Sequence, residues 1–492
     1  MIRTIVADGK SEYEALAGLA GRGGAPGAEV EQAVRKIIED VRAEGDAAVV
    51  RYAQQFDGPC AAPGGRIKEL SRGDLKAAFE SLGAPLADAL LHAAQNIRAY
   101  HERQAEALKG YEERYPNRGG ANGATVPESR AGLFDAEGPG GIDDAGDVVI
   151  GQVVRGLARI GVYVPGGTAA YPSTVLMNVI PAKLAGVGEI VMVTPPGMGA
   201  GFGADAADAE NADRRAADAA DESRRAATGA DAAVLGAAYI AGVDRVFLAG
   251  GAQAVAALAL GTESFPRVDK IVGPGNIYVA TAKRLLYGVV DIDMIAGPSE
   301  ILVIADGSAD AAFVAADLLS QAEHDPLSAS ILLTTDPGLA EEAAAHVEKQ
   351  LKRLTRQDTA RKAIDKNGLI IICRSEDEMA ALANEAAPEH VQILTADPFG
   401  LLTQIKNAGS VFLGAFTPEP VGDYYAGTNH VLPTGGTARF ASPLGVYDFV
   451  KRMSYTHYTK AALEKAKGDI IMLGNAEGLT AHVNAVKIRF DD

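Results

Sequence analysis

Short runs of β-branched and other apolar residues alternate with runs of helical periodicity between about residues 160 and 415. Such alternation is typical of parallel sheets covered by helices. The runs expected to form strands are 159–164, 189–194, 245–248, 270–272, 301–305, 330–334, 369–373, 390–395 and 410–413. The helical runs between them include 174–184, 232–240, 311–321 and 339–354. Because nine strands exceed a comfortable single sheet, the pattern predicts an α/β fold with two α/β units.

The rest of the chain follows other patterns. Residues 29–110 carry apolar side chains at helical spacing, and the last ~45 residues are expected to be helical and polar. Residues 116–147 are rich in Gly, Pro and Asp and are expected to form a loop. Residues 198–230 are almost wholly Ala, Asp, Arg, Gly and Glu. They could form a solvated helical excursion or stay disordered, because they offer little to bury.

Length, charge and cysteine content exclude several classes of protein. The 492 residues are too many for one ordinary core, and the net charge of -18 makes nucleic acid or an anionic membrane a poor partner. Cys60 and Cys373 lie in no CxxC pattern, so neither a disulfide framework nor a thiolate metal site is implied. The chain shows neither the apolar core of a signal peptide nor a membrane-spanning run. We therefore expect a cytoplasmic protein.

Four of the eight histidines stand in polar or Gly- and Pro-rich surroundings. The most informative is His390, which follows Glu389 and opens the apolar run 391–394. A junction of loop and strand is where α/β proteins place reacting groups, and imidazole titrates near neutral pH and is the commonest metal ligand. The other three are His324, His430 and His482. From the residues alone, each of these histidines also fits a structural role.

Three glycine-rich segments each follow a predicted strand and precede a predicted helix. They are 161–167, 250–253 and 273–276. Glycine at such a turn lets the backbone approach a ligand and aims amide groups at it. No segment matches the GxGxxG dinucleotide fingerprint with its acidic partner. Each segment alone also fits a tight turn, but three at successive strand ends favour a ligand site.

The order and number of several sequence blocks point to one family. The blocks are Gly161-Val-Tyr-Val-Pro-Gly-Gly-Thr, Gly250-Gly-Ala-Gln-Ala-Val-Ala-Ala-Leu-Ala, Val272-Gly-Pro-Gly-Asn-Ile-Tyr-Val, Ala296-Gly-Pro-Ser-Glu, Ser320-Gln-Ala-Glu-His-Asp-Pro, Pro388-Glu-His, Gly422-Asp-Tyr, Asn429-His-Val-Leu-Pro-Thr and Glu477-Gly-Leu-Thr-Ala-His. With them, the chain resembles histidinol dehydrogenase over nearly its whole length. That family oxidises L-histidinol to L-histidine with two NAD molecules, through an aldehyde, as the last steps of histidine biosynthesis.

The resemblance also implies an architecture. It implies a homodimer whose subunit has two incomplete Rossmann-like domains with parallel sheets, plus small C-terminal helical elements that reach the partner subunit. We expect residues 1–161 with 300–444 to form the first domain, which carries the Glu-His pair and much of the metal site. Residues 162–299 are then the second domain, on the NAD side, and 445–492 the C-terminal elements. Residues 116–147 and 198–230 look longer than in a typical member.

Zinc, one ion per subunit, is the metal that the resemblance implies. The matching ligand positions are Gln321, His324, Asp423 and His482. Gln321 and His324 lie three residues apart at a predicted helix end, so one helix face can present both. Two imidazoles and a carboxylate form a borderline-soft set that suits zinc, although glutamine is an atypical ligand. In the family this metal binds the imidazole and amino nitrogens of the substrate.

The resemblance also assigns the catalytic residues. His390 matches the base that takes the alcohol proton as hydride leaves for NAD, and Glu389 matches the residue that activates water for attack on the aldehyde. Ser299 and Glu477 match further contacts to the substrate, which the four metal ligands and His390 also touch. Contacts to NAD match three residues in or beside the glycine-rich segments, namely Tyr163, Gln253 and Asn276.

Three other functions remain open from the sequence. The first is a related NAD-dependent dehydrogenase of another diol or amino alcohol, although Glu477 would repel an anionic substrate. The second is a zinc hydrolase with Glu389 as base, against which the absence of an HExxH motif counts. The third is a metal- or ligand-binding protein without catalysis.

Overall fold

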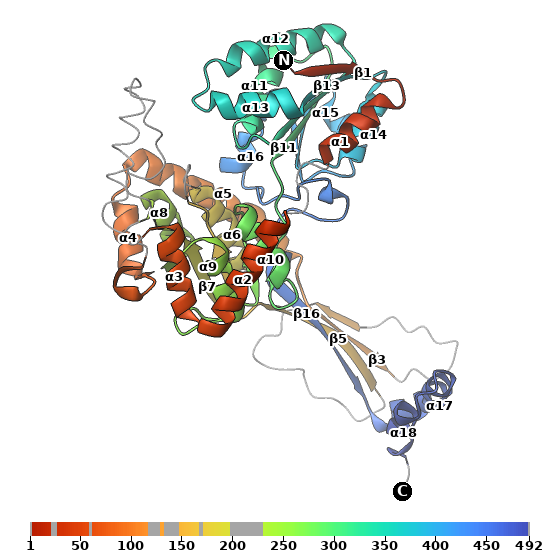
Figure 1. The fold of residues 1–492 in the computed structure, drawn as a ribbon. Helices are drawn as coiled ribbons and strands as arrows, with labels where there is room; N and C mark the ends of the chain where they lie inside the picture. The colour runs from red at the N-terminus through yellow and green to blue at the C-terminus, as the bar shows by residue number, and fades with distance from the viewer. Residues whose placement is uncertain are drawn as a thin grey trace. The chain divides into compact units, whose positions relative to one another are not determined.

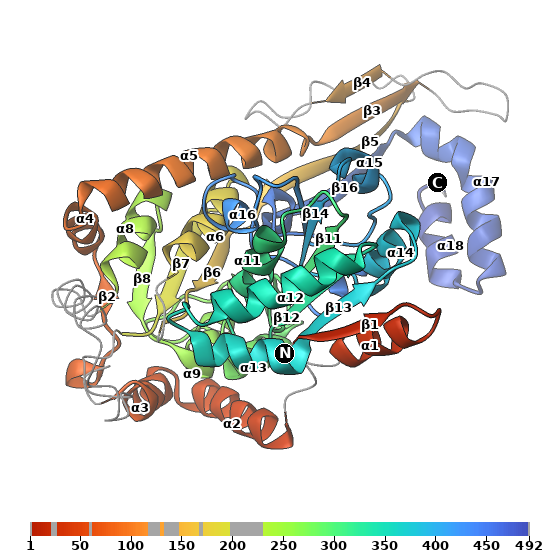
Figure 2. The ribbon, with the colours of Figure 1, turned by 90° about the horizontal axis from the view of Figure 1, so that it is seen from above.

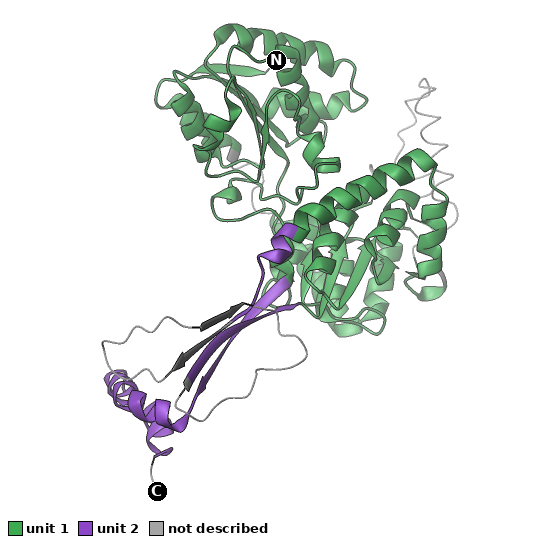
Figure 3. Ribbon diagram, turned by 180° about the vertical axis from the view of Figure 1, so that it is seen from behind, with its two compact units in different colours: residues 1–102, 157–449 green, residues 103–156, 450–492 purple. Residues whose placement is uncertain are grey.

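The computed structural model describes residues 2–20, 27–58, 62–116, 128–131, 147–166, 171–196 and 230–490. The chain forms two compact units (Figure 3). Unit 1 consists of Met1–Glu102 and Leu157–Phe449, and unit 2 of Arg103–Gly156 and Val450–Asp492. Unit 1 contains two six-stranded sheets, which we call sheet A and sheet B, and unit 2 contains one four-stranded sheet.

Sheet A is parallel throughout. Its strands, in spatial order, are β1 (Arg3–Val6), β13 (Gly368–Ile372), β12 (Ala329–Thr334), β11 (Glu300–Ala305), β14 (His390–Leu394) and β15 (Ser410–Leu413). Every residue of β11, β12 and β14 is buried. Parallel strands covered on both faces read as continuous apolar runs, which is why the sequence pattern located them.

Helices cover both faces of sheet A, because successive side chains of a strand point to opposite faces. In β11, Ile301 and Val303 pack with one group of helices, whereas Leu302 and Ile304 pack with the other. The first group is α11 (Ala311–Ala322), α12 (Pro337–Leu351) and α13 (Gln357–Asn367), visible over the strands in Figure 2. The second group is α1 (Ser11–Ala20), α14 (Glu376–Ala386) and α15 (Pro398–Leu402).

Sheet B is parallel except at one edge. Its strands, in spatial order, are β10 (Asp291–Ile292), β9 (Lys270–Val272), β6 (Arg159–Tyr163), β7 (Glu189–Thr194), β8 (Arg245–Leu248) and the antiparallel β2 (Glu69–Leu70). The same alternation divides its side chains between two cores. In β7, Ile190 and Met192 belong to one core, and Val191 and Val193 to the other.

Eight helices accompany sheet B among the described residues (Figure 1). The helices that pack in the core with Ile190 are α4 (Arg72–Glu80), α5 (Ala84–Glu106), α6 (Pro172–Leu184) and α8 (Ala232–Ala241). The helices that pack in the core with Val191 are α2 (Ala28–Glu44), α3 (Asp46–Phe56), α9 (Gly251–Leu260) and α10 (Ile277–Leu286). The parallel α/β architecture expected from the sequence is thus confirmed, and all nine predicted strands form.

Unit 2 contains an antiparallel sheet that the sequence pattern did not predict. Its strands, in spatial order, are β16 (Val450–Tyr458), β5 (Asp147–Gly156), β3 (Tyr111–Pro116) and β4 (Glu128–Ala131), and α17 (Lys460–Ala476) and α18 (Thr480–Lys487) follow. The expectation of a loop over 116–147 is wrong for β4, whose residues Glu-Ser-Arg-Ala show no apolar alternation. Residues 117–127 and 132–146 lie outside the described part.

The compact units divide the chain differently from the domain bounds that the sequence suggested. Helices α2 to α5 pack with sheet B, and 103–156 join 450–492 in unit 2. The domain bounds drawn from the sequence therefore stay a prediction. Cys373 is buried, as expected, whereas Cys60 and residues 198–229 lie outside the described part.

Among the described residues, no helix combines the length and the apolar character that crossing a membrane requires.

Candidate active site

The Glu389–His390 pair lies at the amino-end edge of sheet A. His390 is the first residue of β14 and pairs in register with Ile301 of β11 and Ser410 of β15. Ser299 directly precedes β11, and its carbonyl oxygen accepts a hydrogen bond from Ala329 N at 3.0 Å. The parallel register therefore brings the starts of β11 and β14 side by side, and with them the predicted substrate contact and the predicted base.

His390 has one ring nitrogen fixed by the backbone. Its Nδ1 lies 2.9 Å from the carbonyl oxygen of Glu300, and the residue is 3% exposed. A carbonyl oxygen only accepts hydrogen bonds, so in the neutral ring Nδ1 carries the hydrogen and Nε2 carries the lone pair. The backbone of β11 thus leaves Nε2 as the basic nitrogen.

Glu389 is held by the same strand. Its Oε2 accepts a hydrogen bond from Glu300 N at 2.9 Å and lies 3.6 Å from His390 Nδ1. Burial raises the pKa of Glu389 well above its ordinary value, although the Glu300 amide opposes the shift. Burial also lowers the pKa of His390, against the opposing charge of Asp423. Two proton acceptors with shifted pKa values therefore lie next to each other, as general acid–base chemistry requires.

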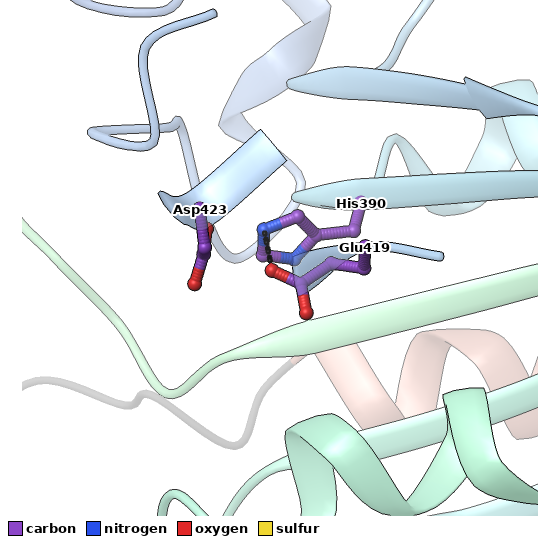
Figure 4. Close-up of side chains that lie close together, drawn as sticks. All are labelled: His390, Glu419 and Asp423. Atoms are coloured by element: carbon purple, nitrogen blue, oxygen red, sulfur yellow. Dashed lines mark ion pairs between the residues drawn. The ribbon is translucent and has the colours of Figure 1, made fainter. Parts of the chain in front are cut away.

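A second carboxylate, Glu419, lies on the other side of the ring. Its Oε1 is 3.6 Å from His390 Nε2, and the side chain is 2% exposed. It stands four residues before Asp423, which lies on the short helix α16 (Pro420–Tyr424). The ligating atoms of His390, Glu419 and Asp423 all lie within 4.8 Å of one another, the one such group found among the described residues (Figure 4).

The pKa of Glu419 reflects the polar groups that lie close to it. Burial raises the pKa of Glu419 to about 9, and the negative charge of Asp423 adds to the shift. The amide of Gln321 opposes it, which places that side chain nearby. The sequence analysis missed Glu419. The available signal was its spacing, because a carboxylate one helical turn before Asp423 shares a face with it.

The end of α11 supplies two further predicted residues. Gln321 lies in the last turn of α11 and is 1% exposed, and its Nε2 has no hydrogen-bond partner. His324 follows the helix and is exposed, and burial lowers the pKa of His430, against the opposing charge of Asp423. His430 Nδ1 lies 3.2 Å from the carbonyl oxygen of Asp423. Unit 1 therefore gathers most of the predicted metal and catalytic residues.

Glu477 and His482 belong to unit 2. Glu477 is the C-cap residue of α17, His482 lies on α18, and both side chains are exposed. Their roles in substrate and metal binding stay predictions.

The donor set fits a divalent cation. Glu419 Oε1 is a buried acceptor atom without a partner beside the carboxylate of Asp423 and the imidazole of His390, and such atoms are rarely left unsatisfied. The group that geometry brings together, His390 with Glu419 and Asp423, shares only Asp423 with the ligand set that the sequence predicted. The predicted set leaves His390 free to act as a base.

The predicted NAD residues lie at carboxyl ends of sheet B strands, where open α/β sheets bind ligands. Tyr163 ends β6, and its hydroxyl accepts a hydrogen bond from Gly251 N at 3.0 Å. Gln253 on α9 is 1% exposed, and neither polar atom of its side chain has a partner. Asn276 is exposed and caps α10 by accepting hydrogen bonds from two backbone amides. An unpartnered amide beside glycine-rich turns fits a dinucleotide.

Asp317, one helical turn before Gln321, is a buried acid with a testable pH effect. It is 6% exposed, and burial raises its pKa from 3.8 to about 7, although a hydrogen bond from Gln392 opposes the shift. Between these two values the folded state holds a proton that the unfolded state has released, so stability falls as pH rises.

We expect Asp317→Asn to remove this dependence. The free energy of unfolding of Asp317→Asn should exceed that of the unsubstituted protein by an amount that increases by about 2–3 kcal/mol from pH 5 to pH 8. This estimate follows because one pKa unit corresponds to about 1.36 kcal/mol. Urea unfolding of both chelated proteins at the two pH values measures this difference. A gain that is equal at both pH values would mean that Asp317 is ionised throughout. Asp358→Asn, at an exposed position in the first turn of α13, is the control.

Known proteins resemble this chain over nearly its whole length. The family model described as histidinol dehydrogenase matches residues 22–207 and 223–490. The chain belongs to the histidinol dehydrogenase family. A histidinol dehydrogenase of Listeria monocytogenes is 47% identical over 466 residues, covering 94% of each chain. One of Streptococcus mutans is 47% identical over 465 residues, covering 94% of this chain and 93% of that one.

A solved structure supports the same assignment. The crystal structure of histidinol dehydrogenase from Elizabethkingia anophelis has a TM-score of 0.79 and 34% sequence identity, and the match covers 99% of this chain and 98% of that one. The predicted family and the α/β fold class are confirmed. The chain is an oxidoreductase of this family, and nothing in the comparisons favours the hydrolase or the non-enzymatic alternative.

Proposed function

We propose that this chain oxidises L-histidinol to L-histidine in two successive steps through L-histidinal, at one site around Glu389 and His390. The observation that carries the proposal is the buried pair itself, in which Glu300 fixes His390 Nδ1 and leaves Nε2 as the base. Membership of the histidinol dehydrogenase family supplies the substrate.

In the first step, His390 Nε2 accepts the proton of the substrate alcohol while hydride leaves the same carbon. Its lowered pKa keeps the ring neutral, and therefore able to accept a proton, at neutral pH. Tyr163, Gln253 and Asn276 would hold NAD, which would supply the hydride acceptor. The carbonyl of Glu300 then stabilises the ring after protonation, because Nδ1–H still donates to it.

In the second step, Glu389 accepts a proton from the water that attacks the aldehyde carbon. Its raised pKa makes the carboxylate a stronger base than an exposed glutamate. As water adds, His390 returns the proton that it took in the first step to the aldehyde oxygen, and it can then accept a proton from the hydrated aldehyde as the second hydride leaves. Two proton acceptors therefore serve two oxidations at one carbon.

Zinc, when held by Gln321, His324, Asp423 and His482, supplies a positive charge that orients the imidazole and amino groups of the substrate. Ser299 and Glu477 complete the substrate site in this proposal. One zinc ion per subunit, a homodimer and a cytoplasmic location belong to the same proposal.

Metal removal tests the metal part of the proposal. Dialysis against a chelator should abolish turnover of L-histidinol, and added zinc should restore it. His324→Ala should leave the purified protein with well under one zinc per subunit, because the metal loses one of its two imidazoles. His346→Ala, on α12, is the control and should retain zinc. Full zinc content in His324→Ala would contradict the assigned ligand set.

A panel of alcohols tests the substrate. L-histidinol should be oxidised far faster than other amino alcohols or an anionic propanediol, since the site presents Glu477 and a cation for a basic substrate. Preference for another diol or amino alcohol would favour the related-dehydrogenase alternative.

A further inference from the structure

A buried ion pair stands beside the glycine-rich loop 273–276 of sheet B. Lys283 lies on α10, and Asp293 directly follows β10. Their side chains are 3% and 1% exposed, and Lys283 Nζ pairs with Asp293 Oδ1. Neither residue belongs to the proposed catalytic or metal machinery.

Both members of the pair also bind the backbone of Gly273. Asp293 Oδ2 accepts a hydrogen bond from Gly273 N at 2.7 Å, and Lys283 Nζ donates one to Gly273 O at 2.9 Å. Asp293 Oδ1 accepts a third from Met294 N at 2.6 Å. The ion pair thus satisfies both polar backbone groups of the first residue of the loop.

Gly273 directly follows β9 and lies against Tyr163 at the end of β6. Its φ is +106°, a backbone conformation that favours glycine, and a Cβ at this position would overlap the carbonyl oxygen of Tyr163. Three residues later, Asn276 caps α10 because its Oδ1 accepts hydrogen bonds from Tyr278 N and Val279 N. The position of Gly273 therefore sets how Tyr163 and Asn276 are placed relative to each other.

The cost of burying two charges indicates that the ion pair has a role beyond packing. Two buried charges lose their hydration, and well-packed apolar side chains of similar volume are often as stable or more so. What this pair provides, and an apolar pair could not, is a donor and an acceptor for the loop backbone. Lys270 offers a contrast, because its ammonium pairs with Asp291, which is 52% exposed, and donates to Asp448 O and not to the loop.

We propose that Lys283 and Asp293 are positioning residues for NAD, which fix the loop 273–276 so that Asn276 and Tyr163 meet the dinucleotide together. This inference rests on the proposed function, because it assumes that NAD binds these loops. The pair touches neither the metal cluster nor the Glu389–His390 pair in the contacts described above. Its removal should therefore affect the cofactor and spare the substrate.

The test compares three variants of the full chain loaded with zinc. Asp293→Asn keeps the shape of the side chain and removes the charge, and Lys283→Met removes the ammonium. Lys270→Met is the matched control, a buried lysine on the neighbouring strand β9. NADH binding is followed by the fluorescence of the nicotinamide, L-histidinol binding by calorimetry, and folding by circular dichroism and thermal unfolding.

We expect Asp293→Asn and Lys283→Met to raise the Kd for NADH and the KM for NAD by about tenfold to a hundredfold, as displaced binding groups do. Zinc content and the Kd for L-histidinol should stay within about twofold of the unsubstituted protein. Lys270→Met should lower the thermal midpoint without raising the Kd for NADH. Should Lys283→Met fail to fold, Asp293→Asn decides, because its side chain still accepts hydrogen bonds.

Three results would overturn the inference, and they differ in what they imply. Folded variants that bind NADH as tightly as the unsubstituted protein would reduce the ion pair to a structural role and leave the proposed function intact. An unsubstituted protein that binds no NADH would overturn the proposed function as well. Equal weakening of NADH and L-histidinol binding would also contradict a role confined to the cofactor loop.

Discussion

Replacing His390 with Asn is expected to lower kcat for both oxidations by about 10²–10⁴-fold, the usual contribution of a positioned general base. The substitution keeps a donor near the carbonyl oxygen of Glu300 but removes the basic nitrogen Nε2. Because the same nitrogen accepts a proton in both proposed steps, the rates of oxidation of L-histidinol and of supplied L-histidinal should fall together. Stopped-flow measurement of NADH formation from each substrate provides the two rates.

The control for His390→Asn is His92→Asn, at an exposed position on α5. It should leave both rates unchanged. A variant at His390 that slows only one of the two oxidations would show that the steps use different bases. Retained zinc content in the variant would separate loss of the base from loss of the metal.

Replacing Glu389 with Gln is expected to stop the reaction after the first oxidation. The amide cannot accept a proton from water, so the second rate should fall by about 10²–10⁴-fold while the first changes much less. One NADH should form rapidly for each L-histidinol, and the second should follow very slowly. Rapid-quench detection of L-histidinal, together with NADH absorbance, measures this separation.

Glu376→Gln, in the first turn of α14, is the matched control for Glu389→Gln and should form both NADH molecules at the normal rates. Normal four-electron turnover by Glu389→Gln would remove the water-activating role. A loss of both steps would instead indicate that Glu389 mainly holds the start of β11, through its hydrogen bond from Glu300 N.

The two parallel sheets could be predicted from the sequence because their buried strands are continuous runs of apolar residues. Strands such as β7 and β8 form over the same residues that the pattern indicated. The antiparallel sheet of unit 2 left no such signal. Strand β16 is largely exposed, and its place is set by backbone pairing with β5, from Val450 opposite Gly156 to Tyr458 opposite Val148. Pairing of distant backbones depends little on side-chain periodicity.

The candidate site could be predicted where one local pattern held two residues together. Gln321 and His324 share a helix end, and Glu389 precedes His390. The spacing of Glu419 from Asp423 could have indicated a shared face, but the proximity of Glu419 to His390 depends on how the segment before α16 packs. The buried ion pair at Lys283 and Asp293 was missed for the same reason, since both read as ordinary charges in the sequence.

The yield of NADH per molecule of L-histidinol tests the central claim, that one site performs both oxidations. The zinc-loaded full chain is given limiting L-histidinol and excess NAD, and NADH absorbance is followed to completion. Two NADH should form per L-histidinol, with L-histidine as the product. A yield of one, with L-histidinal accumulating, would contradict the claim, and no NADH at all would contradict the proposed function.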